Sequence, residues 1–155
     1  FKTIFTDRRC PEDPTVYIYI SAKYHPADAP GDCENWFVLV NAPCNSGQNW
    51  KKEIHGCREA VLRKVKKVLG IDLAPRLICE KVLHPLRIEK DTSSRKGSIY
   101  GISSNSRIAA FMRQRNRSTY YKGLYFCGGS AHPGGGIPLV LLSGKITADL
   151  IRRHE

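Results

Sequence analysis

The sequence lacks any long apolar run, and this absence excludes one class of protein. It has no stretch of eighteen apolar residues, and the longest apolar run near its end is only Ile137–Leu142. Because a membrane-spanning helix needs about 20 predominantly apolar residues, we expect no such helix. The start has no basic segment followed by an apolar one, so we also expect no secretory signal. The first residue is Phe1 rather than Met, which predicts a piece of a longer protein.

The sequence also lacks the cysteine spacings of a closed zinc site. None of its six cysteines forms a C-x-x-C pair, and His55 beside Cys57 does not complete a ligand set. An even cysteine count permits disulfides. With long irregular spacings and no secretory signal, reduced thiols that pack as small hydrophobes are the favoured interpretation. We therefore expect no metal.

Signatures of specific nucleic-acid binding are missing too, although the net charge is +11. Neither RNA-binding aromatic motifs nor zinc-finger spacings occur, so we expect no specific nucleic-acid partner. The basic residues cluster at Arg63–Lys67, Arg113–Arg117 and Arg152–Arg153. An anionic membrane surface is a better candidate partner for this charge.

The apolar patterns in the first half of the sequence predict a small sheet and a long helix. Phe1–Phe5 and Thr15–Ser21 have strand patterns, and the apolar run Trp36–Asn41 predicts a strand buried on both faces. Asn49–Leu69 has apolar residues at steps of three and four, which predicts a helix. Gly70 stands where a left-handed residue commonly ends a helix.

The second half predicts shorter elements and one more helix. We expect strands at Leu77–Leu83 and Leu124–Cys127, a polar loop at His84–Lys96 and an irregular Arg-rich segment at Ile102–Thr119. A helix is predicted from about Pro138 to Arg153. The predicted fold class is α+β, with a mainly antiparallel sheet and two principal helices.

The segment GLYFCGGSAHPGGGIPLVLLSGKITADLI carries most of the functional information. It predicts a strand, a glycine-rich turn and a helix, and glycines let a backbone approach a ligand closely. The free N–H groups of Ile137, Leu139 and Val140 would favour an anion or a polarised carbonyl at the helix start. The spacing is neither G-x-G-x-x-G nor that of a P-loop, so geometry alone is a weak signal.

The amino-acid sequence of this segment resembles the C-terminal signature of the phytoene desaturase family of flavoproteins. That signature has the form G-L-Y-x-x-G, then T-H-P-G-x-G-x-P, then a helix with S-G-K. Ala131 replaces the usual Thr, which loses a hydroxyl but keeps the glycines. The matching residues are Gly123, Leu124, Tyr125, Gly128, His132, Pro133, Gly134, Gly136, Pro138, Ser143, Gly144 and Lys145.

The resemblance extends over nearly the whole chain. Four further segments are similar to the same proteins in the same order: Asp13–Tyr17, Ala29–Gly31, Asn35–Pro43 and Gly97–Gly101, followed by the region of Arg113. The resemblance implies the last third of a two-domain FAD/NAD(P)-binding flavoprotein, of the phytoene or diapophytoene dehydrogenase type.

By this resemblance, residues 1–122 belong to a polyene-binding substrate domain, and residues 123–155 complete an FAD-binding domain as a strand, turn and helix. The N-terminal nucleotide-binding unit is absent here, so the chain alone should be inactive. The implied cofactor is FAD, held against backbone donors that would stabilise reduced flavin. The implied cofactor-binding residues are Gly128, Gly129, Gly136, Ile137, Pro138, Leu139 and Val140.

The implied reaction removes two hydrogens from a carotenoid precursor. His132 is the candidate catalytic residue, with a role in fixing the turn slightly favoured over proton transfer. Tyr17, Tyr19, Trp36 and Phe37 either line a substrate tunnel or belong to the core, and the core is favoured. The resemblance specifies neither the carotenoid, the number of steps, the proton and electron acceptors nor the oligomeric state.

A bilayer substrate implies a cytoplasmic enzyme bound peripherally to an anionic membrane surface. Carotenoid isomerases, retinol saturases and amine oxidases share the architecture and remain alternatives. A second alternative is a non-enzymatic basic binding domain that is complete as it stands.

Overall fold

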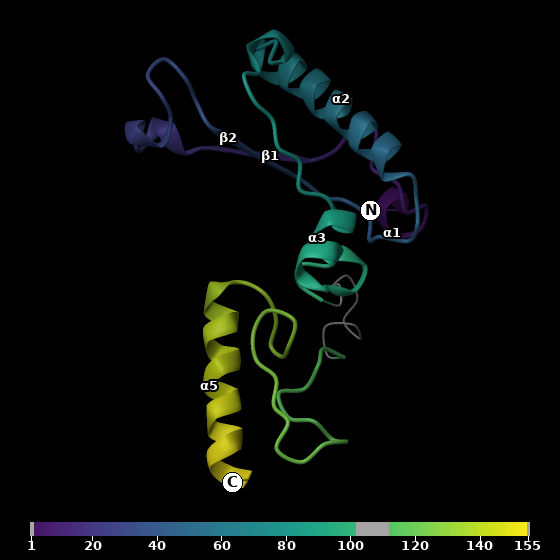
Figure 1. Ribbon diagram of the computed structural model, residues 1–155, viewed down its shortest axis with the longest axis vertical. Coiled ribbons are helices and arrows are strands. Elements are labelled where there is room, and N and C mark those ends of the chain that lie inside the picture. Colours follow the sequence, from purple (N-terminus) through teal and green to yellow (C-terminus); the bar gives the residue numbers. More distant parts are fainter. Residues whose placement is uncertain (1, 102–111, 155) are drawn as a thin grey trace. The chain divides into compact units, whose positions relative to one another are not determined.

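The computed structural model describes residues 2–101 and 112–154 (Figure 1). It divides into two compact units, residues Phe1–Leu86 and Arg87–Glu155. The helices and the two-stranded antiparallel sheet confirm the predicted α+β class. The predicted division at residue 122 concerns domains of a longer protein and stays a prediction.

The first unit is built on an antiparallel hairpin of β1 (Val16–Ile20) and β2 (Trp36–Val40). The register pairs Val16 with Val40 at one end and Ile20 with Trp36 at the other. Both strands were predicted, but the burial of both faces of β2 was wrong. Phe37, Val38 and Leu39 are exposed, because no further layer of the described chain covers them.

Helix α2 (Trp50–Leu69) confirms the predicted long helix and both of its ends. The Asn49 side chain accepts a hydrogen bond from the Lys52 amide as the N-cap, and Gly70 is left-handed at the C-terminal end. Lys64 Nζ donates to Asp13 Oδ1 and to the Pro14 carbonyl, both at 2.7 Å. These bonds fix α2 to the segment that leads into β1.

Three predictions for short elements before residue 101 were wrong. Residues Lys2–Phe5 form the short helix α1 rather than a strand, with the Thr6 amide bonded to the Lys2 carbonyl. Leu77–Leu83 is exposed and irregular, because no strand of the described residues pairs with it. The predicted loop contains α3 (Pro85–Thr92), in which Pro85 occupies the first helical position, where its missing N–H costs nothing.

Four short 3-10 helices complete the described elements. Two lie between β1 and β2, one follows α2, and one follows α3. Their bounds are Ser21–Lys23, Pro26–Asp28, Ala74–Arg76 and Arg95–Gly97.

The second unit contains α5 (Ile137–His154), which confirms the predicted last helix. Figure 1 shows α5 beside the irregular chain that precedes it. The strand predicted at Leu124–Cys127 does not form, and Tyr125 pairs with Arg117 in an isolated bridge. The Phe126 carbonyl is taken by side chains of Asn116 and Thr147 instead of a neighbouring strand. Most of the predicted segment Ile102–Thr119, up to residue 111, lies outside the described residues.

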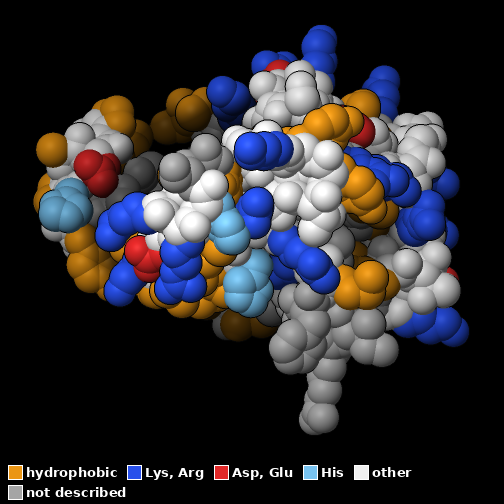
Figure 2. Space-filling model, turned by 90° about the horizontal axis from the view of Figure 1, so that it is seen from below, with side chains coloured by type: hydrophobic (Ala, Val, Ile, Leu, Met, Phe, Trp, Pro, Cys, Tyr) orange, Lys and Arg blue, Asp and Glu red, His pale blue; other side chains and the backbone are white. Residues whose placement is uncertain are grey.

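The chain is strongly basic, with a net charge of +11. Figure 2 shows Lys and Arg side chains over much of the visible face and few acidic ones. Residues 87–155 carry twelve Lys and Arg against four Asp and Glu, so most of the net charge of +11 belongs to the second unit. None of the helices in the described part of the chain is long and apolar enough to cross a bilayer.

Candidate functional site

The candidate site is the glycine-rich turn, residues Gly128–Gly136, together with the start of α5. Gly128, Gly134 and Gly136 have φ angles of 110°, 138° and 102°, a region that favours glycine. At Gly135 the constraint is space, because a Cβ atom there would lie 2.5 Å from Cδ1 of Tyr100. Gly128, Gly134 and Gly136 are therefore required by the conformation of the turn, and Gly135 by its close packing.

A buried amide holds the turn to the helix. Asn116 is 4% exposed, and its Nδ2 donates to the carbonyls of Phe126 and His132 at 3.1 and 2.9 Å. The same nitrogen lies 3.1 Å from Ser143 Oγ and 3.2 Å from Thr147 Oγ1. One side chain thus joins the chain before the turn, the turn itself and α5.

The two hydroxyls of α5 complete this arrangement, which we call the Asn116 network. Ser143, fully buried, donates to the His132 carbonyl at 2.8 Å and accepts from the Gly128 amide at 3.2 Å. Thr147 donates from its hydroxyl to the Phe126 and Ser143 carbonyls. The start and the middle of the turn are therefore bonded to one face of α5.

The start of α5 differs from the prediction at one position. The Val140 amide donates to the Gly136 carbonyl at 2.9 Å, so it is not free to bind a ligand. Pro138 has no N–H, and the amides of Ile137 and Leu139 have no hydrogen-bond partner among the described residues. Ile137 is 79% exposed and Leu139 is 41% exposed, so both residues lie at the surface of the unit.

His132 contributes to the turn through its backbone. Its amide donates to the Gln114 carbonyl at 2.9 Å, and its carbonyl accepts from Asn116 and Ser143. The imidazole is exposed and has no hydrogen-bond partner in the described residues. The main chain, not the imidazole, therefore fixes the turn here, and the catalytic role of His132 stays a prediction.

The aromatic residues of the hairpin lie in the other unit. Tyr17, Tyr19 and Phe37 are 56%, 41% and 59% exposed, so their assignment to the core was wrong. Trp36 is half-buried and its Nε1 donates to Glu34. Their place in a substrate tunnel stays a prediction.

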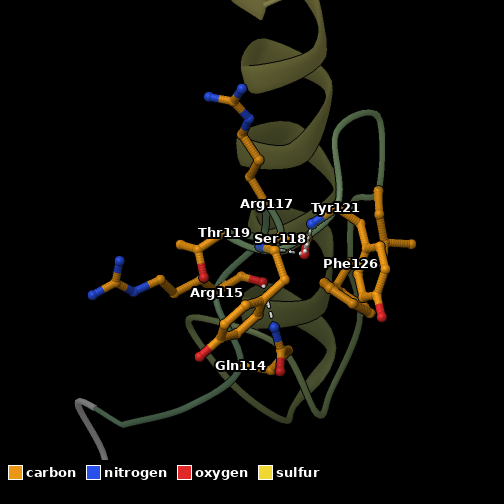
Figure 3. Close-up of a pocket in the computed structure, with 9 residues that line it drawn as sticks. Gln114, Arg115, Arg117, Ser118, Thr119, Tyr121 and Phe126 are labelled. Atoms are coloured by element: carbon orange, nitrogen blue, oxygen red, sulfur yellow. Dashed lines mark hydrogen bonds between the residues drawn. The ribbon is translucent and has the colours of Figure 1, made fainter.

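A shallow hollow lies beside the turn (Figure 3). Its volume is about 200 Å³, below the roughly 300 Å³ at which ligand pockets begin. The Ser118 hydroxyl accepts from the Tyr120 and Tyr121 amides at its rim, which gives it a structural role. We therefore assign no ligand to it. It is lined by Gln114, Arg115, Arg117, Ser118, Thr119, Tyr120, Tyr121, Leu124 and Phe126.

The six cysteines are free thiols, and two of them interact. A hydrogen bond between Cys10 and Cys57 lowers the pKa of Cys57 and, together with burial, raises the pKa of Cys10. The Cys10 amide also donates to Glu53 Oε2 at 2.8 Å, one helical turn before Cys57. Within residues 2–101 and 112–154, no three His, Cys, Asp or Glu side chains gather as a metal site would require.

Sequence reasoning found the turn but missed most of what holds it. It singled out Ser143 only as part of a motif, and it gave no role to Asn116 or Thr147. Ser143 and Thr147 are four residues apart, so they lie on one face of a helix, and that spacing was a usable signal. Nothing in the sequence pairs this face with Asn116, because that contact is tertiary.

Comparison with known proteins supports the resemblance over the whole chain. The chain is 51% identical over 151 residues to a 1-hydroxycarotenoid 3,4-desaturase of Flavobacterium sp. (strain P99-3), covering 97% of the chain. It is 37% and 36% identical to 4,4'-diaponeurosporene oxygenases of Staphylococcus haemolyticus (strain JCSC1435) and Staphylococcus aureus (strain MSSA476), covering 100% of the chain.

These alignments also show how much of each relative's length the chain covers. No protein-family model matches the sequence. The chain spans about 31% of the length of each of the three relatives. The family expected from the glycine-rich segment is confirmed by these matches. Over nearly its whole length the chain matches a part of carotenoid desaturase-type proteins, and it belongs to that family.

Proposed function

We propose that this chain is the C-terminal part of a longer protein, the parent enzyme, which is an FAD-dependent carotenoid desaturase. The observation that carries this proposal is the glycine-rich turn, which the Asn116 network bonds to α5. It ends at two amides that have no partner among residues 2–101 and 112–154. The similarity to a 1-hydroxycarotenoid 3,4-desaturase at 51% identity supports the reaction class.

The residues of the turn suit a flavin. Gly128, Gly134 and Gly136 have backbone angles that few side chains allow, and they keep the turn surface free of Cβ atoms. The amides of Ile137 and Leu139, at the positive end of α5, are donors of the kind that stabilise a carbonyl or negative charge at the edge of a ring. When bound, FAD supplies the two-electron oxidant that takes the hydride from the substrate.

In this proposal, residues 123–155 complete the FAD-binding domain and the earlier residues belong to the substrate domain. The exposed side chains of Tyr17, Tyr19 and Phe37 suit an apolar polyene, because burying them against such a substrate removes apolar surface from water. The Asn116 network keeps the turn and helix start in place, so that the donors need no rearrangement when substrate reacts.

We also propose that the parent enzyme meets its substrate at an anionic membrane surface. The basic residues of the second unit would each contribute about 1 kcal/mol when close to anionic lipid. Co-sedimentation of the parent enzyme with vesicles should rise with anionic lipid and fall with salt. Binding that ignores both lipid charge and salt would contradict this part of the proposal.

The test of function is product analysis with the parent enzyme. Purified protein should contain flavin and convert an acyclic carotenoid precursor to products about 2 Da lighter per step, because each desaturation removes two hydrogens. Phytoene, diapophytoene and hydroxylated carotenoids are the substrates to compare. Products about 14 to 16 Da heavier would instead indicate an oxygenase, as the names of the staphylococcal relatives would suggest.

Other outcomes separate the remaining alternatives. An unchanged mass with a shifted cis/trans pattern would indicate an isomerase, and turnover restricted to retinol or to amines would indicate a saturase or an amine oxidase. Specific retention of a nucleic acid by a flavin-free protein would indicate a basic binding domain. The chain of 155 residues alone should show no turnover and no flavin absorbance.

A further inference from the structure

Arg113 connects two segments that meet at the glycine-rich turn. Its Nη1 donates to the Tyr100 carbonyl at 3.0 Å and to the Gly129 carbonyl at 3.1 Å. The guanidinium also lies against Gly134, where an added Cβ atom would be 3.1 Å from Nε and 3.2 Å from Cζ. A single half-buried side chain therefore contacts the turn at two positions five residues apart.

The segment that Arg113 attaches is packed closely against the turn. A Cβ atom at Gly101 would lie 3.3 Å from Cβ of Ser130, and the Tyr100 ring lies beside Gly129 and Gly135. The two carbonyls bound by Arg113 thus belong to surfaces already in contact. The planar guanidinium reaches Gly134 through Nε and Cζ while its Nη1 binds both carbonyls, and the compact ammonium group of Lys would not fill the same space.

The position of Arg113 also matters for charge. Gly134 precedes the first residue of α5 by three positions, so the guanidinium lies close to the positive end of the helix dipole. Ile137 and Leu139, whose amides are the proposed donors, follow closely after the glycine-rich turn. A side chain that fixes the turn between Gly129 and Gly134 therefore fixes the direction of these donors.

We propose that Arg113 is a positioning residue for the flavin, acting through the glycine-rich turn. This inference rests on the proposed function and extends it to a residue outside the glycine motif. Arg113 holds the turn in the shape in which the two amides meet the flavin, and its charge favours the reduced, negatively charged flavin. Its removal should weaken FAD binding and lower the reduction potential of bound flavin.

The experiment uses the parent enzyme with its flavin removed and then titrated with FAD. Arg113→Gln should bind FAD at least about tenfold more weakly, because two charge-assisted hydrogen bonds are lost. Arg113→Lys keeps the positive charge but not the planar guanidinium. This variant should therefore have the reduction potential of the wild-type enzyme and an FAD affinity between those of the wild-type enzyme and Arg113→Gln. The matched control is Arg115→Gln, which removes the same charge from an exposed side chain two residues along and should change affinity less than about twofold.

The outcomes are distinguishable. If the wild-type parent enzyme takes up no FAD, the proposed function fails, and this inference fails with it. If the wild-type enzyme binds FAD and Arg113→Gln matches it in affinity and potential, only the role of Arg113 is overturned. A lower unfolding temperature of flavin-free Arg113→Gln and Arg113→Lys, with unchanged potential, would also overturn it, because Arg113 would then support the fold alone.

Discussion

Asn116 Nδ2 and Ser143 Oγ lie 3.1 Å apart in a buried contact between residues 27 positions apart in the sequence. The Asn116 amide joins Ser143 to the His132 carbonyl, and Ser143 in turn accepts from the Gly128 amide. The contact therefore decides where the glycine-rich turn lies on α5. Its physical basis is the cost of burying polar groups without partners, which keeps all of these groups together.

Asn116→Ala should destabilise the parent enzyme by about 2 to 3 kcal/mol, because several buried hydrogen bonds are lost together. Ser143→Ala should cost about 1 to 3 kcal/mol, because the Gly128 amide loses its acceptor. Chemical unfolding of the flavin-bound enzyme measures both. Ser130→Ala, an exposed serine of the same turn, is the control and should stay within about 0.5 kcal/mol. Equal stability of all three variants would show that the network has no energetic role.

Two glycines of the same motif should respond to alanine in opposite ways. Gly135→Ala places a Cβ atom against the Tyr100 ring and should cost about 1 to 3 kcal/mol. Gly144 lies within α5 with no atom within 4 Å of an added Cβ, so Gly144→Ala should stabilise by about 0.5 to 1 kcal/mol. Thermal unfolding compares the two. Adding Tyr100→Ala to Gly135→Ala should restore much of the loss, and a failure to restore it would contradict the steric cause.

His132→Ala should leave both flavin content and turnover within about twofold of the wild-type enzyme. The imidazole is exposed and has no hydrogen-bond partner among the described residues, and exposed side chains of this kind contribute little. Steady-state rates and the flavin absorbance of the purified parent enzyme measure the two effects. A fall in rate of about 100-fold or more at normal flavin content would instead assign His132 an acid–base role.

Cys57 should react with iodoacetamide at lower pH than Cys10, because the hydrogen bond between the two thiols lowers the pKa of Cys57 and raises that of Cys10. A lowered pKa populates the reactive thiolate at lower pH. Peptide mass mapping of the parent enzyme after alkylation over a pH series measures both residues. In Cys10→Ala the Cys57 profile should move to higher pH, and an unmoved profile would contradict the coupling.

Local sequence patterns were enough to predict the elements whose structure depends mainly on their own residues. The apolar spacing of Asn49–Leu69 with Gly70, and the alternation before Ser21, correspond to α2 and β1. Leu77–Leu83 has an equally good strand pattern but no partner in the described chain, and a strand needs one. Pro85 was interpreted as the end of a strand, whereas it begins α3, because proline is compatible with both positions.

In the candidate site, too, local features were predicted from the sequence and tertiary contacts were not. The glycines and the helix start were found from the sequence because they are contiguous. The Asn116 network and the Arg113 contacts join segments that lie far apart in the chain, and no local pattern predicts such pairs. Val140 was assigned a free amide because the prediction began the helix at about Pro138, whereas the first hydrogen bond of the helix already reaches Gly136.

The most direct test of this account is a structure of the parent enzyme with FAD bound. The account predicts that the amides of Ile137 and Leu139 lie within hydrogen-bonding distance of the isoalloxazine ring, about 2.7 to 3.2 Å from its polar atoms. A structure in which residues 128–140 lie away from the flavin, or in which FAD is absent from a fully active enzyme, would contradict it.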